Sequence, residues 1–316
     1  MQAVFFNGET RVMEMARPQI RQGEALVRVV KAGICSTDLE LMKGFMGFRG
    51  VLGHEFVGVV EDSSNASLKD KRVVGEINCV CHKCTRCRME MPHHCSDRTV
   101  LGIEGRDGAF AEYLTLPEEN LHVVPDSVSD EVAVFTEPLA AAYRILEQVE
   151  VEQTDRIIVL GGGRLGQLIS QVLFTRSKNL TCIGKNRWKL ELLNDLRIPT
   201  AHVNEPQERG MADIVVEATG SYEGFERALE LVRPEGTIVL KTTVAHPTAF
   251  NMSVPVINEA KIIGSRCGPF RPALEALELG TIEVGQMITD TYELADAVTA
   301  LERAGDPDVL KILLEM

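Results

Sequence analysis

The spacing of apolar residues divides the chain into two parts. Up to about residue 135, short β-branched runs such as 26–30 and 57–60 are separated by turns rich in Gly, Asn, Asp and Ser. From Pro138 onward, apolar runs typical of buried strands alternate with segments of helical spacing. The first pattern predicts a β domain, and the second predicts βαβ units that form a parallel sheet.

The second part predicts strands and helices in alternation. Strands are expected at 156–160, 180–183, 213–217, 237–240 and 261–264, and helices at 165–175, 188–196 and 222–232. A further helix at 294–304 and a strand at 309–314 follow near the C-terminus. Because helical crossovers connect neighbouring parallel strands, this order predicts a doubly wound sheet.

Length and charge narrow the class of protein. Single cores stop growing near ~250–300 residues, so a chain of 316 residues predicts two domains. The net charge of −13 disfavours nucleic acid and anionic membranes as partners, because both need a basic surface. The apolar runs are far shorter than the ~18 residues that span a bilayer, and the first residues do not resemble a signal peptide. A cytoplasmic protein is therefore expected.

A glycine-rich loop joins the first predicted strand of the second part to the helix that follows. Gly161, Gly163 and Gly166 have the spacing G-x-G-x-x-G, with Arg164 and Leu165 inside the motif. The three glycines permit a tight turn, a close approach of pyrophosphate to the backbone, and close packing of helix on strand. The helix N-terminus then offers free N–H groups to the phosphates. This context predicts a dinucleotide-binding site.

The end of the next strand bears on the choice of dinucleotide. An acidic residue is expected there to hold the ribose hydroxyls of NAD. The sequence instead has Gly184, followed by Lys185, Asn186 and Arg187. The two cations suit a 2′-phosphate and favour NADP over NAD, although they could also be solvated surface charges.

Four of the eight cysteines are crowded into one short segment, the lobe 79–96. Cys81, Cys84, Cys87 and Cys95 have the spacing of a closed, four-thiolate structural zinc site. Two alternatives are four free buried cysteines and an iron–sulfur cluster, and both fit the rest of the chain less well.

Three other motifs combine donors that a catalytic zinc accepts. They are Cys35-Ser36-Thr37-Asp38, Gly53-His54-Glu55 and Thr136-Glu137-Pro138. Each motif is unremarkable alone, but together they offer a thiolate, an imidazole and two carboxylates. A catalytic zinc needs about three protein ligands and one open position.

These motifs, in this order, make the chain similar to the zinc-containing medium-chain dehydrogenases, most of all to the glucose, sorbitol and threonine dehydrogenase branch. The motifs Glu217-Ala218-Thr219-Gly220 and Arg233-Pro234-Glu235-Gly236 extend the resemblance over nearly the whole chain. It implies a GroES-like β-barrel catalytic domain around an inserted Rossmann domain. The expected ranges are 1–137 for the catalytic domain, 138–270 for the Rossmann domain and 271–316 for the return to the first.

The resemblance also implies roles for the metal-site residues. Cys35 and His54 are expected to ligate a catalytic zinc, and Asp38 to orient His54. Either Glu55 or Glu137 is the expected third ligand, and the sequence leaves that choice open.

Further expected roles concern substrate and cofactor. Thr37 should bond the substrate oxygen, and Thr219 should lie at the cofactor. Many relatives have histidine at the outer end of a proton relay where this chain has Glu40, which can also accept a proton.

The expected function is therefore hydride transfer between a secondary alcohol, polyol or sugar hydroxyl and NAD(P), in a homodimer or homotetramer. One alternative is a quinone or enone reductase, whose relatives lack both zinc sites. Another is a non-enzymatic dinucleotide-sensing protein on the same fold.

Overall fold

The computed structural model describes residues 1–243 and 249–316, and the chain divides into two compact units. The first unit contains Met1–Glu137 and Phe270–Met316, and the second contains Pro138–Pro269. The chain thus leaves the first unit once and returns to it at Phe270. The structure confirms the expected fold class: a β unit whose sequence is interrupted by a unit with a parallel sheet.

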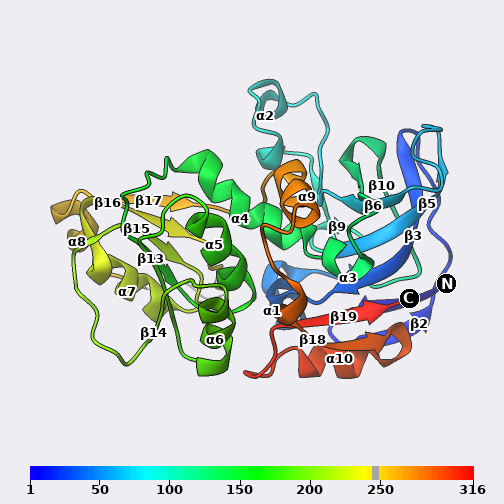
Figure 1. Ribbon diagram of the computed structural model, residues 1–316. Coiled ribbons are helices and arrows are strands. Elements are labelled where there is room, and N and C mark those ends of the chain that lie inside the picture. The colour runs from blue at the N-terminus through cyan, green and yellow to red at the C-terminus, as the bar shows by residue number, and fades with distance from the viewer. Residues whose placement is uncertain (244–248) are drawn as a thin grey trace. The chain divides into compact units, whose positions relative to one another are not determined.

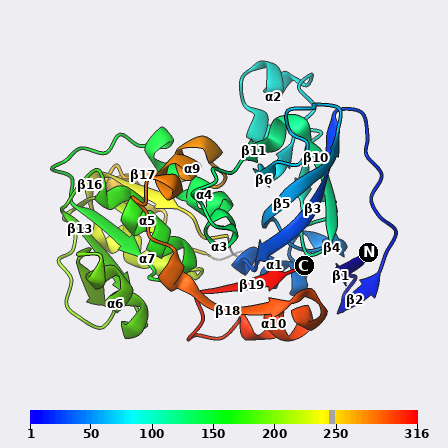
Figure 2. The ribbon, with the colours of Figure 1, turned by 45° about the vertical axis from the view of Figure 1, so that its right-hand side comes forward.

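A seven-stranded sheet forms the centre of the first unit (Figure 1). Its order is β11 (Leu121–Val123), β6 (Arg72–Gly75), β5 (Glu55–Ser63), β3 (Glu24–Gly33), β19 (Lys311–Glu315) and β18 (Ile288–Glu293), and β10 (Tyr113–Pro117) also pairs with β3. The C-terminal strand β19 lies directly beside β3, as Figures 1 and 2 both show. The last strand of the chain, β19, therefore completes the sheet to which β3 belongs.

Two small sheets and several short helices complete the first unit. One sheet contains β1 (Gln2–Phe6), β2 (Thr10–Glu14) and β4 (Gly50–Val51), and the other contains β7 (Asn78–Cys79), β8 (Thr99–Leu101) and β9 (Gly105–Arg106). The helices are α1 (Ser36–Met42), α2 (Thr85–Arg88), α3 (Asp130–Ala133), α9 (Phe270–Glu278) and α10 (Ala297–Arg303), with 3₁₀ turns η1 (Phe45–Gly47), η2 (Pro92–His94), η3 (Glu118–Asn120), η4 (Gly285–Met287) and η5 (Leu294–Asp296).

The second unit is a six-stranded parallel sheet. Its order is β14 (Thr200–His202), β13 (Leu180–Gly184), β12 (Ile157–Leu160), β15 (Ala212–Glu217), β16 (Val232–Leu240) and β17 (Lys261–Gly264). The helices are α4 (Thr136–Gln148), which starts at the end of the first unit, α5 (Arg164–Phe174), α6 (Arg187–Asp195), α7 (Tyr222–Leu231) and α8 (Ser253–Ile257). The strand order reverses direction at β12, and right-handed crossovers then place helices on opposite faces of the sheet.

Burial explains which elements the apolar pattern predicts well. All four residues of β12 are buried, because helices cover both faces of the parallel sheet, and the strand is accordingly a continuous apolar run. β14 and β18 are missing from the expected elements because they are half-buried and carry polar residues at alternate positions or throughout. Helices α4 and α9 are also additional to the expected set.

No helix in the described parts of the chain is both long enough and apolar enough to cross a membrane.

Candidate functional site

One buried carboxylate organises the first group of candidate ligands. Asp38 is completely buried and lies in the first turn of α1, three residues after the N-cap residue Cys35. Its Oδ2 accepts a hydrogen bond from the Cys35 backbone N–H at 2.8 Å, and its Oδ1 accepts one from the Gly53 N–H at 3.2 Å. The same Oδ1 lies 3.3 Å from His54 Nδ1. Asp38 therefore holds the backbone on both sides of the gap between Cys35 and His54.

Cys35, His54 and Glu55 form one donor group. Their donor atoms all lie within 4.8 Å of one another. His54 is 3% exposed and Glu55 is 1% exposed, and neither His54 Nδ1 nor Glu55 Oε1 has a hydrogen bond of acceptable geometry in the described chain. His54 Nδ1 faces Asp38 Oδ1, whereas the buried Glu55 Oε1 has no hydrogen-bond partner in the described chain. Burying a polar atom without a partner is unfavourable, so Glu55 Oε1 indicates a missing ligand. Glu137, half-buried at the start of α4, is not a member of this group.

The donor types in this group suit zinc. A thiolate, an imidazole and a carboxylate are the ligands found at catalytic zinc sites. Burial lowers the pKa of the His54 imidazole, but the adjacent Asp38 carboxylate and the Cys35 thiol outweigh burial and raise this pKa well above its ordinary value. A cation at this position is therefore electrostatically favoured, whether it is a proton or a metal ion.

The other predicted residues of this region surround the donor group. The Thr37 hydroxyl oxygen lies 3.7 Å from Cys35 Sγ, which donates to it. The Glu40 carboxylate is partly exposed, and it accepts a hydrogen bond from Lys43 Nζ at 2.8 Å. Glu40 thus reaches the surface already paired with a cation.

Lys311 is a residue of this site that the sequence reasoning missed. Its ammonium group is buried, pairs with Glu55 Oε2 and donates to the Ile34 carbonyl oxygen at 3.3 Å. A lysine inside the apolar strand 309–314 was the available signal, because such strands rarely bury an unpaired charge.

The four cysteines of the lobe 79–96 form the second donor group. Neighbouring sulfurs lie 3.5 Å apart for Cys84 and Cys87, 3.8 Å for Cys84 and Cys95, and 3.5 Å for Cys95 and Cys81. Disulfide sulfurs lie ~2.05 Å apart, so these thiols are not bonded to one another. A tetrahedron with Zn–S distances of ~2.3 Å has edges of about 3.8 Å, which these separations match.

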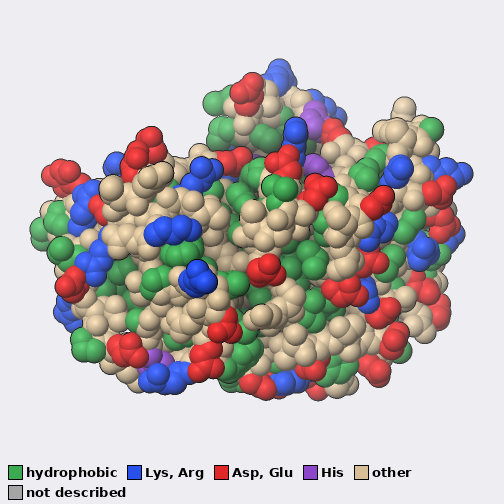
Figure 3. Space-filling view, viewed as in Figure 1, with side chains coloured by type: hydrophobic (Ala, Val, Ile, Leu, Met, Phe, Trp, Pro, Cys, Tyr) green, Lys and Arg blue, Asp and Glu red, His purple; other side chains and the backbone are tan. Residues whose placement is uncertain are grey.

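Local hydrogen bonds favour thiolates in this lobe. Backbone N–H groups of Cys87 and Ser96 lower the pKa of the Cys84 thiol to about 5. Desolvation and hydrogen bonds with neighbouring thiols raise the pKa of Cys87 to about 12, so the ion-free cluster retains protons that a metal ion would displace. Figure 3 shows Lys and Arg side chains on the surface of the lobe around α2, in agreement with the exposure of Lys83, Arg86 and Arg88.

The glycine loop of the second unit has the geometry of a phosphate cradle. Gly161 has φ of 108°, and its N–H donates to the Ile183 carbonyl oxygen at 2.8 Å. Gly163 is the N-cap of α5 and offers no capping side chain, so N–H groups of the first turn remain available to an anion. A Cβ on Gly166 would collide with the Gly161 carbonyl oxygen, which shows why this position needs glycine. Arg164 and Leu165, the other two residues of the motif, begin α5.

The end of β13 is closely packed. Gly184 is buried, and a Cβ there would lie 2.9 Å from Leu190 Cδ2 and 3.3 Å from the Gly162 nitrogen. A larger residue at Gly184 would therefore press on Leu190 and on the glycine loop. Lys185 is the first exposed residue after β13, and Arg187 is exposed at the start of α6.

Two more predicted cofactor residues lie at the ends of strands. Asn186 is the N-cap of α6. The Thr219 hydroxyl donates to Glu217 Oε1 at 2.6 Å, and the Thr219 N–H donates to the same oxygen at 2.8 Å. Glu217 therefore shapes the turn after β15, and the Thr219 hydroxyl is already engaged within the chain.

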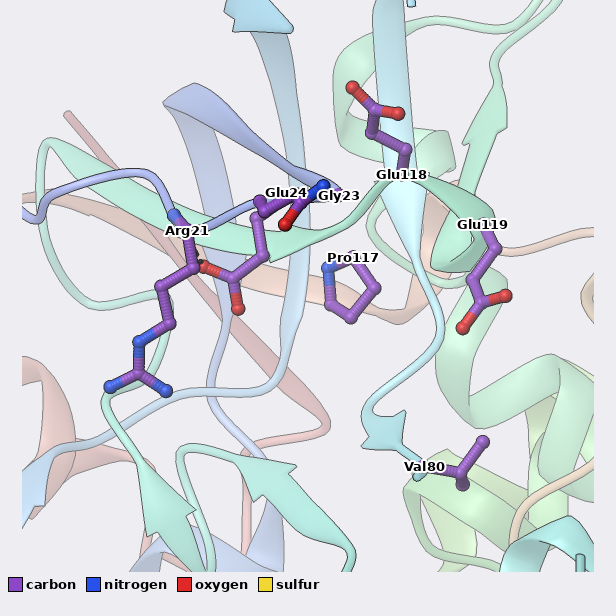
Figure 4. Close-up of a pocket in the computed structure, with 8 residues that line it drawn as sticks. Arg21, Gly23, Glu24, Val80, Pro117, Glu118 and Glu119 are labelled. Carbon is purple, nitrogen blue, oxygen red and sulfur yellow. Dashed lines mark hydrogen bonds between the residues drawn. The ribbon is translucent and has the colours of Figure 1, made fainter. Parts of the chain in front are cut away.

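A surface pocket in the first unit borders the lobe 79–96 through Val80 but includes none of the candidate ligands or cofactor residues. It has a volume of about 460 Å³ and is lined by Arg21, Gln22, Gly23, Glu24, Val80, Pro117, Glu118 and Glu119. In Figure 4 the side chains of Arg21, Glu118 and Glu119 point in different directions and do not converge. Glu24 is paired with Arg106 at 2.7 Å. Because no polar groups converge there, we assign no function to this pocket.

Comparisons with known proteins agree with this geometry. Residues 21–126 match the family model described as the alcohol dehydrogenase GroES-like domain. A sorbitol dehydrogenase from Halalkalibacterium halodurans is 25% identical over 97% of this chain and 96% of its own length. An L-threonine 3-dehydrogenase from Chelativorans sp. is 33% identical over 68% of this chain and 64% of its own length. The solved structure of alcohol dehydrogenase TADH from Thermus sp. ATN1 has a TM-score of 0.91 and 27% identity, and the match covers 100% of both chains.

The glycine loop leads to a prediction that separates packing from ligand approach. Gly166→Ala should lower both the melting temperature and the dinucleotide affinity, because its Cβ collides with the backbone. Gly163→Ala should keep the wild-type melting temperature, because no described atom lies within 4 Å of the added Cβ. It should still weaken dinucleotide binding by about tenfold or more, because the methyl group obstructs the approach of pyrophosphate.

Thermal unfolding and fluorescence titration with NADPH measure the two effects. An equal loss of melting temperature in both variants, or wild-type affinity in Gly163→Ala, would contradict this division of roles.

Proposed function

The chain belongs to the zinc-dependent medium-chain alcohol dehydrogenase superfamily, and on that premise we propose that it oxidises a secondary hydroxyl of a polyol or sugar with a nicotinamide dinucleotide. The observation that carries this proposal is the buried group of Cys35, His54 and Glu55, held in place by Asp38. The names of the relatives point to hydroxyl-bearing small molecules, sorbitol and L-threonine. Such molecules are the expected substrate class for the oxidation.

Cys35 and His54 would hold the catalytic zinc, with Glu55 as the third ligand that the geometry favours over Glu137. Zinc bound there supplies a Lewis acid that lowers the pKa of a substrate hydroxyl, and the bound nicotinamide supplies the hydride acceptor. Asp38 would fix the positions of the Cys35 thiol and the His54 imidazole relative to each other. It would act through these two ligands and not by contact with the substrate.

We propose that Thr37 accepts the proton of the substrate hydroxyl and that Glu40 releases a proton to solvent. Thr37 lies beside the Cys35 sulfur, and a hydroxyl can both accept and donate a proton. Glu40 lies one helical turn further along α1 and is partly exposed, as the outer end of a relay must be.

The second zinc of the proposal belongs to the lobe 79–96. Its ligands would be Cys81, Cys84, Cys87 and Cys95, a closed set with no position for substrate. This ion would therefore be structural. The presence of two donor groups argues against a quinone or enone reductase, whose relatives on this fold lack both.

We expect His54→Ala to abolish turnover on a panel of polyols, sugars and amino alcohols that the wild-type enzyme oxidises. Dinucleotide affinity should stay near the wild-type value, because the glycine loop belongs to the other unit. Steady-state assays and NADPH titration provide the two measurements. Full activity in His54→Ala would exclude a role of this group in the reaction.

Metal analysis of the same proteins tests the zinc assignment. The wild-type protein should contain about two zinc ions per chain, and Cys84→Ser should lose one of them and unfold at a lower temperature. Cys79→Ser is the matched control, because Cys79 is a buried neighbouring thiol outside the four-cysteine group. If Cys84→Ser keeps both ions and the wild-type melting temperature, the structural site is wrongly assigned.

We further propose that NADP is preferred over NAD. Lys185 and Arg187 are exposed next to the end of β13, where a 2′-phosphate would need cations. A phosphate with nearly two negative charges gains more from such cations than a neutral hydroxyl does. A preference of roughly tenfold or more corresponds to ~1.4 kcal/mol, which one charge-assisted hydrogen bond can provide.

Lys185→Asp should reverse this preference, because a carboxylate at the first exposed position accepts ribose hydroxyls and repels phosphate. Gly184→Asp is unsuitable, since its side chain would press on Leu190 and the glycine loop. The measurement is kcat/KM for both dinucleotides at low and high salt, and the wild-type preference should shrink with salt. Arg176→Asp, the same charge change at an exposed position on the far end of α5, should leave the preference intact. Equal use of NAD by the wild type would contradict the proposal.

We also propose a homodimer or homotetramer in which the free edge of the parallel sheet is an interface. In the described chain β17 pairs with β16 alone, and large apolar side chains near it are exposed. They are Phe250, Met252, Val256, Ile257 and Ile262, of which Ile257 is 78% exposed. An apolar patch beside an open strand edge suits an identical surface of a second copy.

Ile257→Glu should weaken the oligomer by at least about tenfold, because it places a charge in the proposed interface. Leu279→Glu is the control, since Leu279 is 75% exposed but lies in the other unit. Sedimentation over a range of protein concentrations measures the effect: a wild-type dimer should dissociate to monomers, and a wild-type tetramer that dissociates only to dimers would indicate a second interface. An unchanged sedimentation profile for Ile257→Glu would contradict the assignment.

A cytoplasmic location is proposed as well, because four thiolate ligands need a reducing compartment. Cell fractionation of the native host tests this proposal, and recovery from an oxidising compartment would contradict it.

A further inference from the structure

Three adjacent strands bring together two charged residues that are 256 positions apart in the sequence. Glu55 on β5 is directly opposite Gly33 on β3, and Leu313 on β19 is opposite Gly33 from the other side. Lys311 precedes Leu313 by two positions and therefore projects from the same face of the sheet. Since Gly33 has no side chain, Glu55 and Lys311 meet across β3.

The space above Gly33 is taken up by this pair together with Val134, whose Cγ1 would lie 2.8 Å from a Cβ on Gly33. A Cβ on Gly33 would lie 2.5 Å from Glu55 Oε2 and 3.4 Å from Lys311 Cδ. Glu55 and Lys311 are each 1% exposed. A buried ammonium group without partners is very unfavourable, and Lys311 meets this requirement with Glu55 Oε2 and the Ile34 carbonyl oxygen. Its Nζ also lies 5.6 Å from the centroid of the Phe135 ring.

The pairing with Lys311 gives the two oxygens of the Glu55 carboxylate different surroundings. Oε2 bonds to Lys311, whereas Oε1 is buried without a hydrogen-bond partner in the described chain. Glu55 is at the same time a member of the donor group with Cys35 and His54. One carboxylate therefore pairs with Lys311 through Oε2 and also belongs to the donor group with Cys35 and His54.

We propose that Lys311 is a positioning residue that limits Glu55 to a single, weakened donor oxygen toward a metal ion held by Cys35 and His54. This inference rests on the proposed function, because it assumes that this group binds zinc. The ammonium group draws negative charge toward Oε2 and so weakens Oε1 as a donor to a metal ion. A weakly held Glu55 keeps one coordination position available for a substrate hydroxyl, which a catalytic site requires and a closed structural site does not.

The test measures metal affinity instead of activity alone. Lys311→Gln removes the charge and retains a donor for Glu55, and it should raise the affinity of this group for zinc by about tenfold or more in chelator competition. With Co²⁺ in the same site, the visible d–d absorption should weaken, because Glu55 adds a donor and raises the coordination number. General damage to the site would lower the affinity instead.

A double-mutant cycle keeps the proposal falsifiable. On a Glu55→Gln background, Lys311→Met should leave metal affinity and the Co²⁺ spectrum unchanged, because the residue acts through the Glu55 carboxylate. This double variant carries neither buried charge, so it is expected to fold even if the single Lys311 variants do not. A changed affinity on that background overturns the proposal, as does unaltered or weaker zinc binding in Lys311→Gln.

Zinc binding by Cys35 and His54 and the role of Lys311 can be tested separately. If Cys35→Ser contains as much zinc as the wild-type protein, this group binds no zinc and the proposed function itself is wrong. If Cys35→Ser loses zinc but Lys311→Gln behaves like the wild-type protein in affinity and Co²⁺ spectrum, only the role of Lys311 is excluded.

Discussion

The Asp38 carboxylate accepts hydrogen bonds from the backbone N–H groups of Cys35 and Gly53 and lies against the His54 ring. These contacts join the start of α1 to the turn before β5, just beyond the end of the ladder between β3 and β5. A buried carboxylate is stable only where several donors surround it, so its position constrains every donor in turn. The distance between the thiol and the imidazole follows from this constraint, whereas the pairing of β5 with β3 places Glu55.

The two donor groups proposed to bind zinc differ in what would keep them together. The four cysteines lie within one lobe of 15 positions, and their sulfurs converge because a short loop folds around a common centre. Such a group depends on its ion for local order. Cys35, His54 and Glu55 are instead positioned by the sheet, by α1 and by Asp38, so their geometry exists before metal binds. Preorganised ligands with an open position are suited to chemistry, and a closed set is suited to stability.

The glycine loop of the second unit also has its donor groups in position before a ligand binds, and here the expected ligand is an anion, the pyrophosphate of a dinucleotide. Gly161 adopts a positive φ, Gly166 permits the backbone to pass close to α5, and the first turn of α5 has N–H groups without a capping side chain. The backbone N–H groups of this loop can bind phosphates without a formal positive charge, and Arg164 lies within the same motif. In the proposed function, dinucleotide binding would depend on this backbone geometry, whereas the choice between NADP and NAD would depend on the exposed side chains after β13.

The sequence by itself determined the features that depend on local spacing. The glycine loop, the four-cysteine lobe and the alternation of strands and helices were predicted correctly as elements, because each depends on residues within a few turns or strands of one another. Only the tertiary structure decided which carboxylate joins Cys35 and His54, because the register of β5, β3 and β19 places Glu55 and Lys311 on either side of Gly33. The packing of Leu190 against Gly184 could not be predicted from the sequence either. It is a contact between the end of β13 and α6 that depends on side-chain volume, and no sequence motif marks it. Contacts between strands that are distant in sequence arise from sheet register, and no local pattern of residues encodes that register.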